Sequence, residues 1–149
     1  RITAGAEQLI TTMRSEGAYC ALVSGGFTFY TSNIRLRLGF DFDQANELEI
    51  IDEKLTGQVI KPILGRSAKE NRLRALCKQQ NIPLSATMAV GDGANDLAML
   101  ATAGLGVAFH AKPIVAEKSE TQVNHSSLTA LLYLQGYKIE DFAIKDFCR

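Results

Sequence analysis

The sequence predicts an α/β fold built on a doubly wound parallel sheet in three layers, with a small β-hairpin added. Short apolar runs alternate along the chain with segments of helical spacing, an order that places helices against a parallel sheet. Two of the runs, Tyr19–Val23 and Leu105–Phe109, are apolar almost throughout. Such runs are typical of parallel strands that are buried on both faces.

The first half of the chain is expected to contain two helices, a strand and the hairpin. Helical spacing covers Ala6–Glu16 and Phe27–Leu38, and the second helix is predicted to turn Phe27, Tyr30, Ile34 and Leu38 inward. The strand Tyr19–Val23 lies between these helices. Within Ala45–Ile60, two short strands are expected to meet around Asp52-Glu53.

The second half is predicted to repeat strand and helix. A helix from the N-cap Ser67 to about Gln80 carries Glu70 at the capping-box position. The later elements are a strand at Met88–Val90, a helix that begins with Asn95 and Asp96 in its first turn, the strand Leu105–Phe109, a helix at Lys112–Lys118, a strand near Val123 and a helix at Ser126–Leu134. Residues 1–137 are interpreted as part of one core domain and residues 138–149 as a tail.

Composition excludes several classes of partner. Lysine plus arginine and aspartate plus glutamate both number 16, which disfavours a broad electrostatic contact with nucleic acid or an anionic membrane. No apolar run approaches the roughly 20 residues that a spanning helix needs. Cys20, Cys77 and Cys148 are far apart with no CxxC spacing, which favours a reducing compartment. We therefore expect a cytoplasmic protein with no nucleic-acid or membrane partner.

The stretch Thr87–Leu100 (TMAVGDGANDLAML) is the strongest candidate site. Asp92 follows an apolar strand, at the edge where ligands of open α/β sheets bind, and the next helix start offers N–H groups to an anion. Asp92 and Asp96 can attract one hard cation such as Mg²⁺. We expect Asp92 to bind the metal directly, Asp96 to support it from the second shell, and Asn95 to donate an amide N–H to phosphate. The alternative is an ordinary turn with Asn95 and Asp96 as caps.

Two other features could serve the same ligand. Ser24-Gly25-Gly26 follows a strand and offers a hydroxyl and unhindered backbone N–H groups to phosphate oxygens; the alternative is a plain strand-to-helix turn. Lys69 lies at a helix start, where the helix dipole does not favour a cation, so it could answer an external anion. The alternative is a solvated surface lysine.

Together, VSGGF at Val23–Phe27, the lysine Lys69 and AVGDGANDLAML resemble phosphatases of the haloacid dehalogenase (HAD) superfamily, and within it the phosphoserine phosphatases. The likeness spans roughly Ile2–Leu134. It implies a HAD core and an Mg²⁺-dependent phosphomonoesterase that works through an aspartyl-phosphate, with O-phospho-L-serine as substrate. By motif match, Ser24 and Gly25 would hold the phosphate, Lys69 would offset its charge, Asn95 would contact substrate, Asp92 would bind Mg²⁺ and Asp96 would support that site.

The family's nucleophile motif, Asp-x-Asp-x-(Thr/Val), does not precede Ser24 in the chain. The one Asp-x-Asp, at Asp41-Phe42-Asp43, follows a predicted helix rather than an apolar strand and is interpreted as a pair of loop carboxylates. We therefore expect the chain to be the C-terminal part of a longer protein, with the nucleophile, the acid/base and the cap upstream of Arg1. The isolated fragment would be inactive, and a homodimer is possible.

Two alternatives remain at this point. One is another small-molecule HAD phosphatase or phosphotransferase, since Gly-Asp-Gly-x-Asn-Asp alone is shared across the superfamily. The other is a non-catalytic module that binds phosphate or metal. The presence of Ser24, Lys69, Asp92 and Asp96 together disfavours the second alternative, because a purely structural module has no need of all four.

Overall fold

The computed structural model describes residues 2–65 and 67–143. Their contacts divide the chain into two compact units. The first unit takes its residues from 1–63 and 126–149, and the second takes residues 64–125. The predicted boundary at residue 138 does not coincide with this division. Among the described residues, no helix combines the length and apolar character that crossing a membrane would require.

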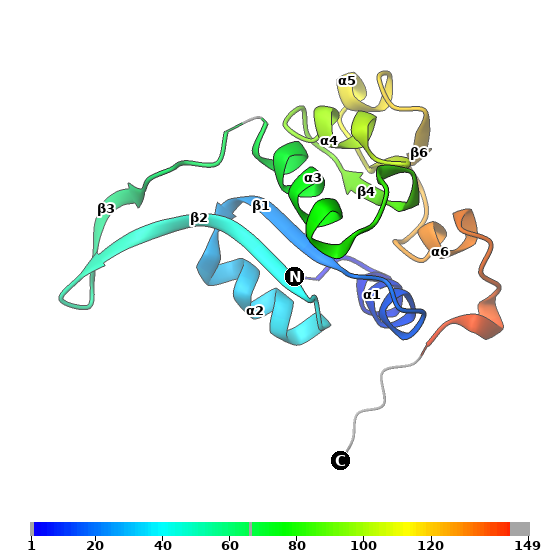
Figure 1. The fold of residues 1–149 in the computed structure, drawn as a ribbon, viewed down its shortest axis with the longest axis horizontal. Helices are drawn as coiled ribbons and strands as arrows, with labels where there is room; N and C mark the ends of the chain where they lie inside the picture. The colour runs from blue at the N-terminus through cyan, green and yellow to red at the C-terminus, as the bar shows by residue number, and fades with distance from the viewer. Residues whose placement is uncertain (1, 66, 144–149) are drawn as a thin grey trace, which may run out of the picture. The chain divides into compact units, whose positions relative to one another are not determined.

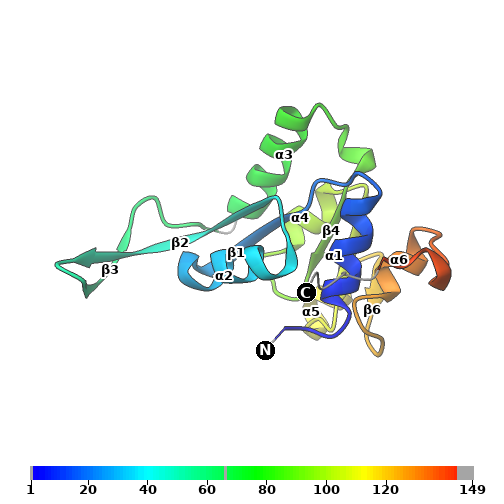
Figure 2. The same ribbon diagram turned by 90° about the horizontal axis from the view of Figure 1, so that it is seen from below.

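The first unit contains a three-stranded sheet in the order β1-β2-β3 (Figure 1). Strands β1 and β2 are parallel, whereas β2 and β3 form an antiparallel hairpin. Helix α2 lies along β1 and β2 (Figure 2). The elements are α1 (Ala6–Ser15), β1 (Ala21–Phe27), α2 (Thr28–Leu38), β2 (Phe42–Ile51), β3 (Lys54–Ile60), α6 (Ala130–Leu134) and the 3₁₀ helix η2 (Ile139–Asp141).

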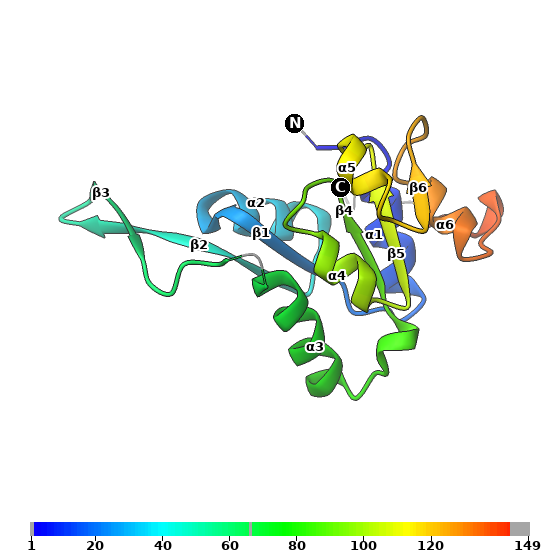
Figure 3. The same cartoon turned by 90° about the horizontal axis from the view of Figure 1, so that it is seen from above.

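The second unit contains a parallel sheet in the order β4-β5-β6 (Figure 3). Its central strand, β5, is the most deeply buried, since Val107 and Ala108 are fully inaccessible. Ala89, Leu100, Ala108 and Val115 form a cluster of buried residues that joins the sheet to α4 and α5. The elements are α3 (Ala68–Gln80), the 3₁₀ helix η1 (Leu84–Ala86), β4 (Met88–Gly91), α4 (Leu97–Thr102), β5 (Leu105–Phe109), α5 (Pro113–Ala116) and β6 (Thr121–Val123).

These elements confirm the α/β class and most of the predicted segments. The hairpin turns at Asp52 and Glu53, whose φ angles of 49° and 61° suit a two-residue turn that matches the twist of the strands. Within the described residues, β1 and β4 each have a hydrogen-bonded neighbour on one side only. This explains why β1 is half-buried rather than buried on both faces as predicted.

Five local predictions are wrong. Strand β1 continues through Ser24 to Phe27, and Tyr30 is 65% exposed rather than inward, while Thr31 is buried. Ser67 is the N-cap of α3 but makes no side-chain cap hydrogen bond, and Glu70 accepts from Arg74 and Thr102 rather than completing a capping box. Helix α4 starts at Leu97, so Asn95 and Asp96 lie before it. The predicted helices at Lys112–Lys118 and Ser126–Leu134 are shorter, Pro113–Ala116 and Ala130–Leu134.

The described part of the tail packs onto the first unit. The Ala143 N–H donates to Oγ1 of the buried Thr12 in α1 at 2.9 Å. The rings of Phe142 and Tyr133 lie 5.0 Å apart between centroids. The rest of the predicted tail, including Cys148, lies outside the described residues.

Cys20, just before β1, is a buried free thiol. Burial raises its pKa to about 11, the nearby Asp41 carboxylate adds to the increase, and Arg14 opposes it. The thiol is therefore protonated at neutral pH and is a poor nucleophile, since only the thiolate reacts readily.

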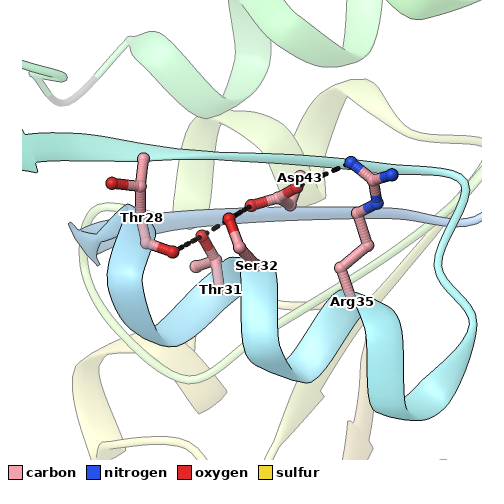
Figure 4. A network of polar contacts seen from close by, with 5 residues as sticks. All are labelled: Thr28, Thr31, Ser32, Arg35 and Asp43. Atoms are coloured by element: carbon pink, nitrogen blue, oxygen red, sulfur yellow. Dashed lines mark hydrogen bonds and ion pairs between the residues drawn. The ribbon is translucent and has the colours of Figure 1, made fainter.

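Asp43 joins α2 to β2 through its carboxylate (Figure 4). Thr31 and Ser32 donate to it at 2.8 and 3.1 Å, and the Arg35 guanidinium pairs with it at 3.3 Å. Burial raises the pKa of the Asp43 carboxyl, but the hydrogen bonds from Thr31, Arg35 and Ser32 and the Arg35 charge outweigh it. The pKa consequently lies below its usual 3.8.

The lowered pKa of Asp43 predicts a pH-dependent contribution to stability. A carboxyl whose folded pKa is depressed stabilises the fold above its unfolded pKa of about 4, and that contribution is lost as pH falls through the folded pKa. In urea unfolding of the full-length protein, Asp43→Asn should therefore destabilise more at pH 6 than at pH 3. Asp52→Asn, at the exposed hairpin turn, should show no such difference. An equal loss for Asp43→Asn at both pH values would contradict the prediction.

Candidate active site

The turn between β4 and α4 is organised around Asp96. Its side chain is only 2% exposed. Oδ2 accepts the backbone N–H groups of Asp92 at 3.1 Å and Gly93 at 3.0 Å. The carboxylate therefore folds back over the turn instead of capping α4, although Asp96 occupies the N-cap position. These two hydrogen bonds hold the backbone that carries Asp92.

Lys69 neutralises the buried Asp96. Its Nζ lies 2.5 Å from Asp96 Oδ1, and 17% of its side chain is exposed. Lys69 is the second residue of α3, so the contact crosses 27 residues of sequence. An ammonium group has three hydrogens to donate, and this bond uses one of them. Lys69 is therefore not a solvated surface lysine. It also has a partner within the protein, so its charge does not serve an external anion alone.

The two glycines of the turn make room for these side chains. A Cβ built on Gly91 would lie 2.4 Å from the Asp96 Cβ, and one built on Gly93 would lie 2.6 Å from Asn95 Oδ1. Real Cβ atoms do not approach so closely, so any larger residue at position 91 would displace Asp96. This close approach explains the glycine at position 91, whereas the contact at Gly93 is with the end of the exposed Asn95 side chain, which can move aside.

Asp92 and Asn95 are the exposed polar side chains of the turn. The backbone carbonyl of Asp92 accepts the Lys112 N–H at 3.2 Å, which ties the turn to the start of α5. Asp92 can supply a carboxylate oxygen, the ligand type that Mg²⁺ prefers. Both Asp96 oxygens already accept hydrogen bonds, so Asp96 suits a supporting role rather than direct coordination. The described residues contain no group of three or more histidine, cysteine or acidic side chains that could hold a metal by itself.

Ser24 and Gly25 belong to the first unit, whereas Lys69, Asp92, Asn95 and Asp96 belong to the second. Ser24 Oγ accepts the Gly26 N–H at 3.0 Å, which closes a tight turn of the kind that serine side chains form. The Gly25 carbonyl accepts a hydrogen bond from the Asn46 side chain at 2.9 Å. Sequence reasoning missed Asn46. The available signal was a polar amide at the start of the predicted hairpin, a kind of residue that is disfavoured in strands.

Asp41 and Asp43 are occupied within the fold. Asp41 pairs with Arg14 at 2.9 Å and accepts the Cys20 N–H at 2.8 Å. Asp43 lies in β2 rather than in a loop, and it accepts the three donors described above. Their interpretation as non-catalytic carboxylates agrees with these contacts, but the placement of Asp43 in a loop was wrong.

Comparison of the sequence with protein-family models shows which family the chain belongs to. The profile of the haloacid dehalogenase-like hydrolases matches residues 1–101. The chain belongs to the haloacid dehalogenase-like hydrolase family. Membership agrees with the resemblance that the Val23–Phe27 and Thr87–Leu100 stretches carry.

Individual HAD-family relatives are similar over nearly the whole chain. A phosphoserine phosphatase of Streptomyces coelicolor is 49% identical over 98% of this chain and 36% of its own length. The crystal structure of an unliganded probable phosphoserine phosphatase from Vibrio cholerae matches 91% of this chain and 42% of that one, with a TM-score of 0.88 and 39% identity. A phospho-aspartyl intermediate analogue of phosphoserine phosphatase matches 90% of this chain and 64% of that one, with a TM-score of 0.84 and 41% identity.

The chain is shorter than these HAD-family relatives. Across eight of the curated phosphoserine phosphatases that it matches, it spans between 32% and 62% of their length. The family match to residues 1–101 includes both candidate stretches, Ser24-Gly25 and Gly91–Asp96.

Proposed function

We propose that the full-length protein hydrolyses O-phospho-L-serine to L-serine and phosphate, with Mg²⁺ as cofactor and an aspartyl-phosphate as intermediate. The observation that carries the proposal is the Asp96 network, which ties Lys69 to the turn and leaves the Asp92 carboxylate exposed. The names of the relatives support the substrate. We further propose that the reaction is a cytoplasmic step, the last in serine synthesis.

Each site residue has a role that its surroundings permit. Ser24 would donate its hydroxyl hydrogen, and Gly25 its N–H, to oxygens of the phosphoryl group. Lys69 would offset the charge that develops on those oxygens, and Asn95 would donate an amide N–H to the substrate. Phosphoryl transfer needs positioning and charge stabilisation of this kind.

Mg²⁺, held by Asp92, would supply further charge stabilisation at the phosphoryl oxygens. Asp96 would keep the Asp92 backbone in place through its two N–H contacts. A carboxylate nucleophile divides the hydrolysis into two easier displacements. We propose that the nucleophile and its acid/base partner lie outside the 149 residues, because Asp41 and Asp43 are engaged in ion pairs and hydrogen bonds of the first unit.

A substrate panel tests the proposal on the full-length protein. Phosphate release should be Mg²⁺-dependent, and kcat/KM for O-phospho-L-serine should exceed that for O-phospho-L-threonine by about tenfold or more, since one methyl group is worth about this much in a fitted pocket. Release that favours another phosphate ester would instead indicate another small-molecule phosphatase. No release from any ester would indicate a module that only binds phosphate or metal.

A further inference from the structure

Ser24-Gly25-Gly26 is a bulge in β1. Val23 pairs with Gln44 of β2, and the next paired residues are Phe27 and Asn46. Four steps along β1 therefore match two steps along β2, so the segment from Ser24 to Gly26 leaves the regular ladder. Bulges of this kind re-aim the chain next to functional sites, but they also remove backbone groups from their ladder partners.

Asn46 takes up one of the groups that the bulge displaces. It is 9% exposed, and its Nδ2 donates to the Gly25 carbonyl at 2.9 Å. A buried amide side chain is costly unless it is hydrogen-bonded, so this contact satisfies both partners. Asn46 is also the last residue of β2 that pairs with β1, and the next residue, Glu47, begins the pairing with β3.

The peptide group between Gly25 and Gly26 is consequently held at both ends. Its carbonyl accepts from Asn46, and its N–H donates to Ser24 Oγ at 3.0 Å. A trans peptide is planar, with the carbonyl and the N–H pointing in opposite directions, so these two bonds set the plane. Because Ser24 Oγ accepts the Gly26 N–H, its own hydrogen is left to donate to another acceptor.

We propose that Asn46 is a positioning residue for phosphate binding: it orients the Gly25–Gly26 peptide and, through it, the Ser24 hydroxyl that donates to the phosphate. Asn46 does not itself touch the substrate. This inference rests on the proposed function, in which Ser24 and Gly25 bind the phosphoryl group. It goes beyond that function by adding a residue of the hairpin strand that supports the turn.

Binding of inorganic phosphate to the full-length protein tests the role. Asn46→Leu keeps the branched, four-atom form of the side chain and removes the donor, and it should raise the inhibition constant for phosphate by about five- to tenfold, the usual worth of one hydrogen bond. Asn33→Ala is the matched control, because Asn33 Nδ2 also donates to a backbone carbonyl, that of Phe29, but on the exposed side of α2. The control should stay within about twofold of the wild type.

A double variant separates positioning from general stability. If Asn46 acts through Ser24, the double variant Ser24→Ala with Asn46→Leu should bind phosphate within about twofold of Ser24→Ala alone, because coupled residues are not additive. Fully additive losses would overturn the positioning role, and so would wild-type binding by Asn46→Leu when Ser24→Ala is weakened. If Ser24→Ala itself binds phosphate normally, the proposed phosphate site fails and this inference fails with it.

A measurement on the unmodified protein covers the case in which Asn46→Leu does not fold. On addition of inorganic phosphate, the NMR signals of the Asn46 side-chain amide should shift, because the Gly25 carbonyl that it contacts belongs to the phosphate-binding turn. The amide signals of Asn33 should not shift. Unchanged Asn46 signals at saturating phosphate would overturn the proposal.

Discussion

Replacing Asp92 with asparagine is expected to lower kcat/KM of the full-length protein at least about a thousandfold, a loss at the upper end of what one electrostatic group contributes. The substitution keeps the size of the side chain and leaves the backbone bonds to Asp96 intact, so the fold should persist. The amide lacks the negative charge that a divalent cation requires. Mn²⁺ binding, followed by its paramagnetic resonance signal, should weaken in parallel with activity.

Asp52→Asn provides the matched control for Asp92. It is the same substitution at another exposed aspartate, placed at the hairpin turn and outside the proposed site. Activity and Mn²⁺ binding should both remain at the wild-type level. Retained Mn²⁺ affinity in the Asp92 variant would refute the assignment of Asp92 as a metal ligand, even if turnover fell.

Replacing Asp96 with asparagine is expected to destabilise the full-length protein by about 3 kcal/mol, the cost of leaving one member of a buried ion pair without its partner. Asp96 is almost fully buried, and Lys69 keeps little access to water, so solvent cannot replace the lost charge. Urea unfolding followed by circular dichroism would measure the change. Activity should fall as well, because the Asp92 and Gly93 N–H groups lose a charged acceptor.

A second substitution shows whether the unpaired charge is the cause. Lys69→Met combined with Asp96→Asn leaves no buried charge and should recover a large part of the lost stability, though not the activity. Glu70→Gln is the matched control, since its exposed pair with Arg74 belongs to the class that contributes little. A double variant less stable than Asp96→Asn alone would show that Lys69 contributes by packing rather than by charge.

Local patterns were sufficient for most of the secondary structure. The run Leu105–Phe109 was predicted with the bounds that the structure has, because a fully apolar run between glycine and a turn has few alternatives. The hairpin at Asp52-Glu53 was equally clear from its turn residues. The prediction that Tyr30 points inward was wrong because helical spacing shows which residues share a face of a helix. It does not show which face the neighbouring strand covers. Thr31 is buried instead, through its bond to Asp43.

In the candidate site too, some features could be predicted from the sequence and others could not. The order of Ser24-Gly25, Lys69 and Gly91–Asp96 along the chain indicated which residues to consider, and the structure gives Asp96 and Lys69 partners that fit those roles. The roles of all six residues toward metal and phosphate stay predictions, including the charge compensation by Lys69 and the support by Asp96. Glu70 was assigned to a capping box on spacing alone, but a side chain from α4, Thr102, was the better-placed partner.

By itself, the sequence determined the α/β class, the family motifs and the place of Asp92 at the end of a strand, because periodicity and turn chemistry act over a few residues. Only the tertiary structure decided the pairing of Lys69 with Asp96 and of Asn46 with Gly25, which join residues 27 and 21 positions apart. The physical reason is that a buried polar group must find a partner, and packing alone decides which partner lies within reach.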